Sequence, residues 1–400
     1  MKAMRVLHIG KFYPPFAGGI EHFLADLLPA LNRQGVIAAA LVHDEQPRRG
    51  GQRPLPGDHP PVYRAPCYGR LLYAPVSLAF PFWLNRAIRE FQPDLLHLHL
   101  PNTSAFWAQM VPAARRLPWV VHWHADVVAS AIDRRMALAY RLYRPFEQRL
   151  LAASQAIIAT SPPYLEASAA LAPWRARCHI IPLGLDPARI ADPGPAARER
   201  AETGWGRTSA FRILAIGRLT YYKGHDILIR AAAALPDTRV LIVGTGEHRD
   251  RLAALIQSLN LNGRVHLPGF QPEADLNALL AGCDVLCLPS LERTEAFGLV
   301  LLEAMRFGKP AVVSDIPGSG PGWVVNQAGH GVPVPPGDPD ALAAALRALQ
   351  HNPAQRAARG QAGLTALREQ FGIEPVAVAI TDLYRQWMPD RQAPGALNPP

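Results

Sequence analysis

The segment DVLCLPSLERTEAFGLVLLEAMRFGKPAVVSD, residues 284–315, decides the fold. Its two short apolar runs, DVLCLPS and PAVVSD, are typical of buried strands, and a helical stretch that Gly308 closes lies between them. Strands that are apolar on both faces and joined by helices indicate a parallel sheet covered on both sides. Glu295 and Glu303 interrupt the apolar run, and a carboxylate buried there without a partner is costly.

The same alternation of strand and helix runs through most of the chain. It covers RVLHIG to CHIIPLG, stops at a segment rich in proline, glycine and charge, and restarts at FRILAIG. The pattern predicts two doubly wound α/β halves with a cleft between them, where ligands bind at the carboxyl ends of strands. The expected parts are an N-terminal domain at 1–184, a linker at 185–210, a C-terminal domain at 211–370, a helix at 371–390 that packs back on the first domain, and a tail at 391–400.

Length and composition agree with this organisation. The chain has 400 residues, a hydrophobic fraction of 49% and a formal net charge of +9. Two domains are expected at this length, and the charge suits an anionic partner such as nucleotide phosphates, acidic lipid or nucleic acid. No recognition helix or clustered basic face favours nucleic acid. The four cysteines show no zinc spacing and are expected to be buried free thiols, as in a reducing compartment.

The N-terminus enters a strand at once, so no signal peptide is evident, and no apolar run is long enough to span a membrane. The stretch 64–89 is aromatic and basic. It fits either a membrane-interface segment or an amphipathic helix packed on its own domain.

The first candidate site is GKFYPPFAGGIEHF, residues 10–23. Gly18 and Gly19 let the backbone approach a ligand, and the helix expected to begin at Ile20 favours an anion at its N-terminus. A plain Gly-Gly turn explains the same residues equally well.

The second candidate site is GRLTYYKGHD, residues 217–226. Arg218 is expected at the carboxyl end of the first strand of the second half, with Lys223 five residues later. Two cations there suit a diphosphate, whereas the alternative is a solvated basic turn.

The third candidate site is VHWHAD, residues 121–126. Alternation places His122 and His124 on one face of a strand, with Asp126 beyond it. These residues match no recognised metal-ligand spacing, so His124 is expected to make a polar contact to substrate. His97 and His99 are expected to be buried imidazoles with satisfied hydrogen bonds.

The fourth candidate site is the carboxylate pair itself. Glu295 and Glu303 can each accept two hydroxyl hydrogen bonds, which suits vicinal diols such as a ribose or a hexose. If a helix begins at 297, the backbone amides of Phe297, Gly298 and Leu299 form an anion site for a phosphate between two sugars. The alternative is that the carboxylates pair with Arg293 and Arg306.

These motifs together resemble a known family. GRLTYYKGHDILIRA, LIVGTGEHRDRL, LPGF and the E-x7-E of Glu295 and Glu303 are similar to the retaining nucleotide-sugar glycosyltransferases of family GT4, which have the GT-B fold. The resemblance extends over nearly the whole chain, including KFYPPFAGGIEHFLADLLPAL and IIPLGLDPARI. It implies two Rossmann-like domains that face each other across a cleft.

The resemblance also implies roles for single residues. Glu295 would hold the hydroxyls of the donor hexose and Glu303 those of the ribose. Arg218 and Lys223 would hold the diphosphate and stabilise its charge as it leaves.

Further roles follow from the same resemblance. Gly18 and Gly19 would form a loop over the diphosphate, and His124 would contact the donor sugar from the facing domain. Neither a metal nor a cofactor is expected, because Arg and Lys neutralise the leaving group. Retention of anomeric configuration is implied as well.

One motif departs from many relatives. After the strand that ends in Ser314 and Asp315, many relatives have a Gly-Gly and a Glu, whereas this sequence reads SDIPGSGPGWVVN. This version resembles bacterial polysaccharide enzymes, several of which use GDP-mannose or GDP-rhamnose. It implies a GDP-mannose-like donor and a lipid-linked saccharide acceptor, in a cytoplasmic protein peripheral to the inner face of the cytoplasmic membrane. A UDP-hexose donor and a nucleotide-sugar epimerase of the same fold are the alternatives.

Overall fold

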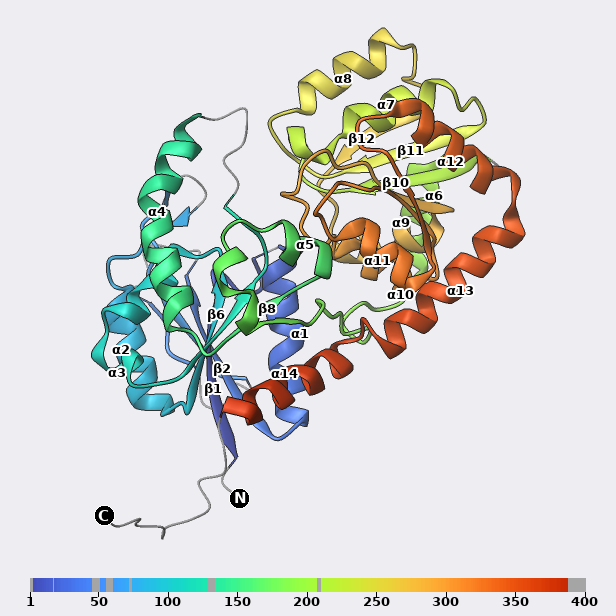
Figure 1. Cartoon of the computed structure of the whole chain (residues 1–400). Helices are drawn as coiled ribbons and strands as arrows, with labels where there is room; N and C mark the ends of the chain where they lie inside the picture. Colours follow the sequence, from blue (N-terminus) through green and yellow to red (C-terminus); the bar gives the residue numbers. More distant parts are fainter. Residues whose placement is uncertain are drawn as a thin grey trace, which may run out of the picture. The chain divides into compact units, whose positions relative to one another are not determined.

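The computed structural model describes residues 3–16, 18–44, 51–54, 60–71, 74–127, 134–206 and 210–387. The chain divides into two compact units (Figure 1). Unit 1 comprises Met1–Ala159, Pro173–Ile181 and Ile373–Pro400, and unit 2 comprises Thr160–Ala172 and Pro182–Gly372. Each unit is an α/β structure built on its own sheet.

Within the described residues, unit 1 holds a seven-stranded parallel sheet of order β3-β2-β1-β6-β7-β8-β9. The central strands β1, β2, β6, β7 and β8 bury apolar residues on both sides, as their near-continuous hydrophobic runs predict, whereas the edge strands β3 and β9 are partly exposed. The strands are β1 Met4–Ile9, β2 Val36–His43, β3 Val62–Ala65, β6 Leu95–Leu100, β7 Trp119–Trp123, β8 Ala156–Ala159 and β9 Cys178–Ile180, with a separate hairpin of β4 Arg70–Leu71 and β5 Ala74–Pro75.

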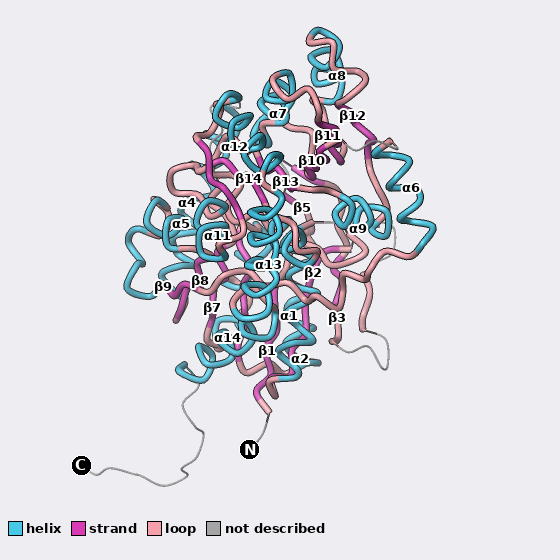
Figure 2. Tube along the Cα trace, turned by 90° about the vertical axis from the view of Figure 1, so that its right-hand side faces the viewer, coloured by secondary structure: helices cyan, strands magenta, loops and turns pink. Residues whose placement is uncertain are grey.

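Two helices distant in sequence cover one face of this sheet. Figure 2 shows α1 (Gly19–Arg33) beside α14 (Ile373–Trp387), the last described helix. Phe23 of α1 and Tyr384 of α14 are both buried and contact the sheet through histidine rings. The remaining helices of this unit are α2 Phe80–Phe91, α3 Pro112–Arg115 and α4 Arg134–Ala153, with short 3-10 turns η1 Thr103–Gln109 and η2 Ala172–Arg177.

In the part of unit 2 that is described, six parallel strands follow the order β12-β11-β10-β13-β14-β15. Buried apolar side chains of β10, β11 and β13 form one core with α7 and α12. The strands are β10 Phe211–Ile216, β11 Thr238–Val243, β12 Val265–Gly269, β13 Val285–Leu288, β14 Ala311–Ser314 and β15 Gly331–Val334. The helices are α5 Pro162–Ala167, α6 Pro195–Trp205, α7 His225–Ala233, α8 Arg249–Ser258, α9 Glu273–Gly282, α10 Val300–Arg306, α11 Pro321–Ala328, α12 Pro339–His351 and α13 Pro353–Glu369, with a 3-10 turn η3 Tyr221–Lys223.

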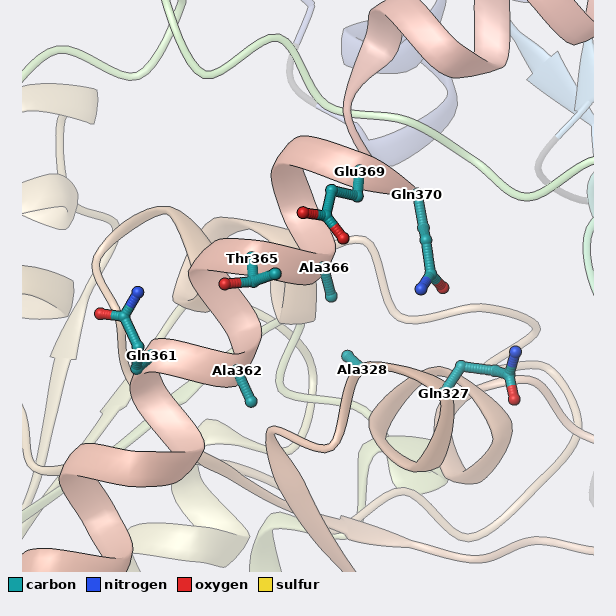
Figure 3. Close-up of a pocket in the computed structure, with 8 residues that line it drawn as sticks. All are labelled: Gln327, Ala328, Gln361, Ala362, Thr365, Ala366, Glu369 and Gln370. Carbon is teal, nitrogen blue, oxygen red and sulfur yellow. The ribbon is translucent and has the colours of Figure 1, made fainter.

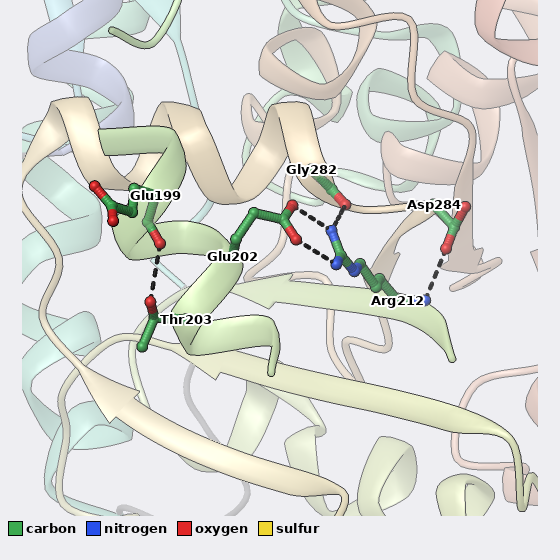
Figure 4. Close-up of polar contacts among 6 residues, drawn as sticks. All are labelled: Glu199, Glu202, Thr203, Arg212, Gly282 and Asp284. Carbon is green, nitrogen blue, oxygen red and sulfur yellow. Dashed lines mark hydrogen bonds and ion pairs between the residues drawn. The ribbon is translucent and has the colours of Figure 1, made fainter. Parts of the chain in front are cut away.

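The segment expected as a linker contains α6, which belongs to unit 2. Trp205 at the end of α6 is fully buried, and Glu202 accepts two hydrogen bonds from Arg212 at 2.7 and 2.6 Å (Figure 4). Arg212 also donates to the carbonyl of Gly282, and its backbone N–H donates to Asp284. This network fixes α6 against the amino-terminal edge of the sheet.

The expected fold class of two doubly wound, Rossmann-like units is confirmed. The short strands β3 and β15 and the β4–β5 hairpin were not expected from the sequence. The expected tail at 391–400 lies outside the described residues, as do the last residues of the helix expected at 371–390. Across the described ranges, no helix combines the length and apolar character needed to cross a bilayer.

Candidate functional site

The strand order of unit 2 marks where a ligand binds. β10 lies between β11 and β13, so the loops after β10 and β13 leave the sheet in opposite directions. In open α/β sheets such a reversal opens a crevice at the carboxyl ends of the strands. The loop after β10 carries Arg218 and Lys223, and the loop after β13 carries Glu295.

Glycine lets these two loops approach closely. Gly224 has a φ of 61°, and a Cβ atom there would lie 2.0 Å from the carbonyl oxygen of Pro289. The N–H of Leu291 donates to the carbonyl of Tyr222 at 2.8 Å. Backbone contact therefore holds Lys223 against the loop that carries Glu295.

Lys223 and Glu295 form an ion pair. The Lys223 Nζ donates to Glu295 Oε2 at 2.6 Å, and the two side chains are 13% and 10% exposed. Ser290 Oγ donates to the same carboxylate oxygen at 3.1 Å, and Ser319 Oγ donates to the backbone carbonyl of Glu295. Both serines are buried, so Ser290 and Lys223 hold the carboxylate while Ser319 holds the backbone of the same residue.

The electrostatics of this pair keep Lys223 charged. Burial by itself would lower the pKa of Lys223, but the nearby Glu295 carboxylate raises it above its ordinary value. Burial lowers the pKa of the neighbouring His225 to about 4, and the charge of Lys223 acts in the same direction. His225 is therefore neutral at pH 7, and its Nε2 lies 3.3 Å from the carbonyl of Arg218.

Arg218 lies at the same end of the sheet with an exposed side chain. The preceding Gly217 is packed against the Lys223 side chain, because a Cβ atom there would lie 3.0 Å from Lys223 Cε. An ammonium group has three donors, so Lys223 can keep its bond to Glu295 and still donate to phosphate oxygens. The structure thus brings together three of the predicted residues.

A helix beginning at 297 would place Glu303 about two turns in and deeper than Glu295, and the structure corrects both points. Helix α10 begins at Val300 and not at 297, so Glu303 lies in its first turn and is only partly buried. Glu295 is the deeper of the two, at 8% exposed. The helix begins late because Gly298 has a φ of 79°, outside the helical region.

This correction also changes the expected anion site. Phe297 and Gly298 precede the helix, and Leu299 is its N-cap. The amides of Phe297 and Gly298 therefore do not belong to the first turn of α10, where the anion site was expected. The loop is fixed by the glycine-rich segment at 318–322: the N–H of Gly320 donates to the carbonyl of Ala296 at 3.0 Å.

The two arginines considered as carboxylate partners have other described contacts. Arg293 donates to the carbonyl of Gly318 at 2.8 Å and lies over the ring of Tyr164. Arg306 pairs with Asp192 at 3.3 Å. The partner of Glu295 is instead Lys223, which is 72 positions away in sequence.

In unit 1, Gly18 and Gly19 lie at the start of α1, with Gly19 as its first residue. A Cβ atom at Gly18 would lie 2.2 Å from the carboxylate of Glu21, so a larger residue there would have to displace the Glu21 side chain. Glu21 is buried, and burial raises its pKa. The helix N-terminus thus already faces a carboxyl group of its own first turn.

His124 follows β7 directly and is 4% exposed. Its Nε2 lies 2.9 Å from Nδ1 of His99, and Nδ1 of His124 has no described partner. His97 and His99, expected to be satisfied imidazoles, are buried, but the Nε2 of His97 has no partner in the described part of the chain. Burial lowers the pKa of His124 well below its ordinary value.

A separate hollow of about 280 Å³ lies between α11 and α13 (Figure 3). Alanine side chains form its floor, and Gln327, Gln361, Thr365, Glu369 and Gln370 form its polar rim. It contains none of the residues predicted from the sequence.

Sequence reasoning missed Ser290 and Ser319. Ser290 closes the strand run DVLCLPS, and this position at the carboxyl end of a buried strand was the available signal. Ser319 lies in the GSG segment that departs from the family pattern, and nothing in the sequence indicates its bond to the carbonyl of Glu295.

Comparison with known families assigns both units. Residues 198–365 match the family described as "Glycosyl transferases group 1", and residues 18–184 match the "Glycosyl transferase 4-like domain". The first match includes all six strands of the unit 2 sheet, and the second includes the unit 1 sheet apart from β1.

Individual relatives match over nearly the full length. The D-rhamnosyltransferase WbpZ of Pseudomonas aeruginosa is 30% identical over 377 residues, which cover 92% of each chain. The O-antigen chain mannosyltransferase C of Escherichia coli is 28% identical over 389 residues, 95% of this chain and 98% of that one. The solved structure of sucrose-phosphate synthase from Thermosynechococcus elongatus superposes with a TM-score of 0.77 at 24% identity and covers 96% of this chain and 99% of that one, so it shares the fold.

Proposed function

The chain belongs to the GT4-type glycosyltransferases of GT-B fold, and on this premise we propose that it transfers a hexose from a nucleoside-diphosphate sugar to a lipid-linked saccharide during synthesis of a bacterial surface polysaccharide. The proposed donor is a GDP-mannose-like sugar. The observation that carries the proposal is the buried Lys223–Glu295 pair at the sheet reversal of unit 2.

The pair supplies what departure of a nucleoside diphosphate requires. Lys223, held charged by Glu295, is a fixed cation for phosphate oxygens, and Arg218 adds a planar guanidinium at the same strand end. Fixed donors and cations stabilise charge as it develops on a leaving group. The second oxygen of Glu295 would accept hydroxyl hydrogen bonds from the hexose, and Glu303 would accept those of the ribose.

The remaining details extend this proposal. We infer that transfer retains the anomeric configuration and needs no metal, since two cations neutralise the diphosphate. Gly18 and Gly19 would approach the diphosphate, which requires the Glu21 carboxyl to yield its place, and His124 would contact the sugar. A UDP-hexose donor is the alternative; an epimerase is not favoured, because the two near full-length relatives described above are named as transferases.

Thermal-shift measurements with GDP, UDP, ADP and their hexose conjugates test the donor. A ligand at 100 times its Kd stabilises the protein by about 2.7 kcal/mol, which raises Tm by roughly 5–11 °C for a domain of 150–250 residues. GDP-mannose should give the largest shift, and Glu303→Gln should reduce it. A larger shift with UDP-hexoses would overturn the donor assignment.

Product analysis tests the reaction. Free nucleoside diphosphate should appear together with an extended acceptor. The one-bond coupling between C1 and H1 of the transferred sugar, measured by NMR, should report the same anomeric configuration as in the donor. An epimerised nucleotide sugar with no extended acceptor would instead support the epimerase.

Contact with the membrane surface is also part of the proposal. Within the stretch 64–89, Tyr68, Leu78 and Phe82 are 61%, 78% and 62% exposed, while the opposite face of α2 is buried in unit 1. Exposed apolar side chains near arginines suit anionic lipid headgroups. Leu78→Ser/Phe82→Ser should weaken co-sedimentation with vesicles of anionic lipid and leave turnover of a soluble acceptor analogue unchanged; equal sedimentation would exclude this contact.

A further inference from the structure

Five described histidines form a column inside unit 1. They come from three adjacent strands, because His8 pairs in register with His97, and His99 with His122, while His124 follows the end of β7. Each is at most 4% exposed. Their rings stack, with centroid separations between 4.3 and 5.4 Å for the pairs along the column.

A thread of hydrogen bonds joins three of these rings. Nδ1 of His8 lies 3.0 Å from Nε2 of His99, and Nδ1 of His99 lies 2.9 Å from Nε2 of His124. Burial lowers the pKa of all three imidazoles, that of His99 to about 3, so each carries one ring proton at pH 7.

Neutral imidazoles in such a thread must all point the same way. Each N···N contact needs one donor and one acceptor, and each neutral ring has one of each. His99 uses both of its nitrogens, so a donor on one side requires an acceptor on the other. Only two arrangements remain: the three protons lie all on Nδ1 or all on Nε2.

The two arrangements differ at the ends of the thread. Nε2 of His8 and Nδ1 of His124 have no partner among the described residues. With the protons on Nε2, an N–H is left unbonded at fully buried His8. With the protons on Nδ1, the unbonded N–H belongs to His124, at the carboxyl end of its strand, and His8 keeps only a lone pair. Each arrangement leaves one N–H and one lone pair without a described partner. Unbonded buried N–H groups are rare, and only the second arrangement puts the N–H at the carboxyl end of a strand, where a ligand oxygen can accept from it, which favours the second arrangement.

We propose that His8 and His99 are positioning residues that hold His124 as the Nδ1–H tautomer, so that His124 donates a hydrogen bond to an oxygen of the donor sugar. This inference rests on the proposed function for the identity of the acceptor oxygen. The tautomer itself depends only on the thread of hydrogen bonds.

A metal ion is the competing explanation for clustered histidines. The ligand atoms of His8, His97 and His99, and those of His99, His122 and His124, lie within 4.8 Å of one another. However, the ring planes of His122 and His124 differ by 2°, and those of His99 and His124 by 15°. Nitrogen lone pairs lie in the ring plane, so stacked parallel rings cannot aim them at one ion. His99 also has both nitrogens engaged already.

The test is 15N NMR of the full chain labelled at histidine, which separates protonated from bare ring nitrogens without turnover. His8, His99 and His124 should each show a proton on Nδ1. A proton on Nε2 of His124, or stoichiometric zinc that changes the ring signals of His99, would overturn the proposal. This readout needs no variant.

A matched pair of variants tests the positioning role. His8→Asn keeps an N–H near the position of Nδ1, whereas His8→Leu removes the donor. His8→Leu removes the donor to Nε2 of His99, so His124 should populate both tautomers and transfer should fall by up to about tenfold, which is the value of roughly one hydrogen bond. His8→Asn should keep the tautomer and retain most of the transfer. Unchanged transfer in His8→Leu would refute the role, whereas a wild-type chain with the expected tautomers but no transfer from any nucleotide sugar would refute the proposed function instead.

Discussion

Unit 1 buries five imidazoles against one another under α1 and α14, whereas unit 2 buries one ammonium group against one carboxylate at the end of its sheet. Both units use the same parallel architecture, and both remove polar groups from water. Unit 1 does so by keeping the groups neutral, and unit 2 does so by pairing opposite charges. The two solutions respond differently to pH and to mutation.

Acidification gives the largest expected difference. The folded pKa values of His8, His97, His99, His122 and His124 lie below the unfolded value of 6.5. Stability is therefore complete above pH 6.5 and is lost as the pH falls, because only the unfolded chain binds the protons. At pH 5 each histidine costs about 2 kcal/mol, and several together approach the whole stability of a domain.

Hydrogen exchange resolves the two units in one experiment. As the pH is lowered from 6.5, amides of β1, β6 and β7 should lose their protection from exchange before pH 5 is reached. Amides of β10 and β13 should lose theirs only at a lower pH. Unit 2 also buries His225 and His330 with lowered pKa values, so it should weaken later and less. Loss of protection in β10 first would contradict the comparison.

Breaking the ion pair of unit 2 has the next largest effect. Lys223→Met removes the cation that pairs with the buried Glu295 carboxylate, which should cost about 3–5 kcal/mol. Lys223→Met/Glu295→Gln removes both charges and should recover most of that stability. Denaturant dependence of exchange in β10 and β13 measures both, and transfer should be lost in both proteins. A double variant as unstable as the single one would show that the pairing is not what matters.

Unit 1 also buries a carboxyl group, that of Glu147, in its neutral form. It is fully buried on α4 and accepts a hydrogen bond from Tyr140 at 3.1 Å, and burial raises its pKa to about 7. The folded state thus holds a proton that the unfolded chain releases near pH 4.5. The stability that it contributes is complete below that pH and is lost as the pH rises through about 7.

Glu147→Gln should therefore stabilise unit 1 by about 2–3 kcal/mol at pH 8 and leave it unchanged at pH 4.5. Thermal unfolding at the two pH values measures this, with Glu199→Gln on an exposed part of α6 as the matched control. Equal shifts at both pH values would mean that Glu147 is not titrating in the folded state.

The smallest expected effect concerns an exposed pair. Glu202 accepts two hydrogen bonds from Arg212, but its side chain is 51% exposed (Figure 4). Glu202→Ala should cost less than about 1 kcal/mol by denaturant titration, because water screens exposed pairs. A cost equal to that of Lys223→Met would show that burial does not separate the two pairs.

Sequence patterns predicted the sheets well but the contacts between distant loops poorly. The run VIAAALVH coincides with β2, because hydrophobic burial on both faces is written in consecutive residues. The Lys223–Glu295 bond depends on the approach of Gly224 to Pro289, which joins loops more than 60 residues apart. No pattern of neighbouring residues in the sequence predicts that these two loops come into contact.

The histidines illustrate the same limit within a sheet. Alternation placed His122 and His124 on one face, and the structure agrees. Which rings touch across strands depends on register, and register follows from packing of whole strands. Helix α10 started later than its apolar pattern suggested, because the backbone of Gly298 decides the boundary.

The position of α14 has a consequence for the order in which the molecule assembles during translation. Unit 1 begins at the N-terminus, yet Tyr384, which is bonded to His97, comes from the last described helix. A ribosome must therefore make all of unit 2 before the histidine face of unit 1 receives its final cover. Domains usually fold as they emerge, so unit 2 should be complete while unit 1 still exposes part of its core to chaperones. In this chain, the sheet of unit 1 is synthesised first, but its core is completely buried only after α14 has been made.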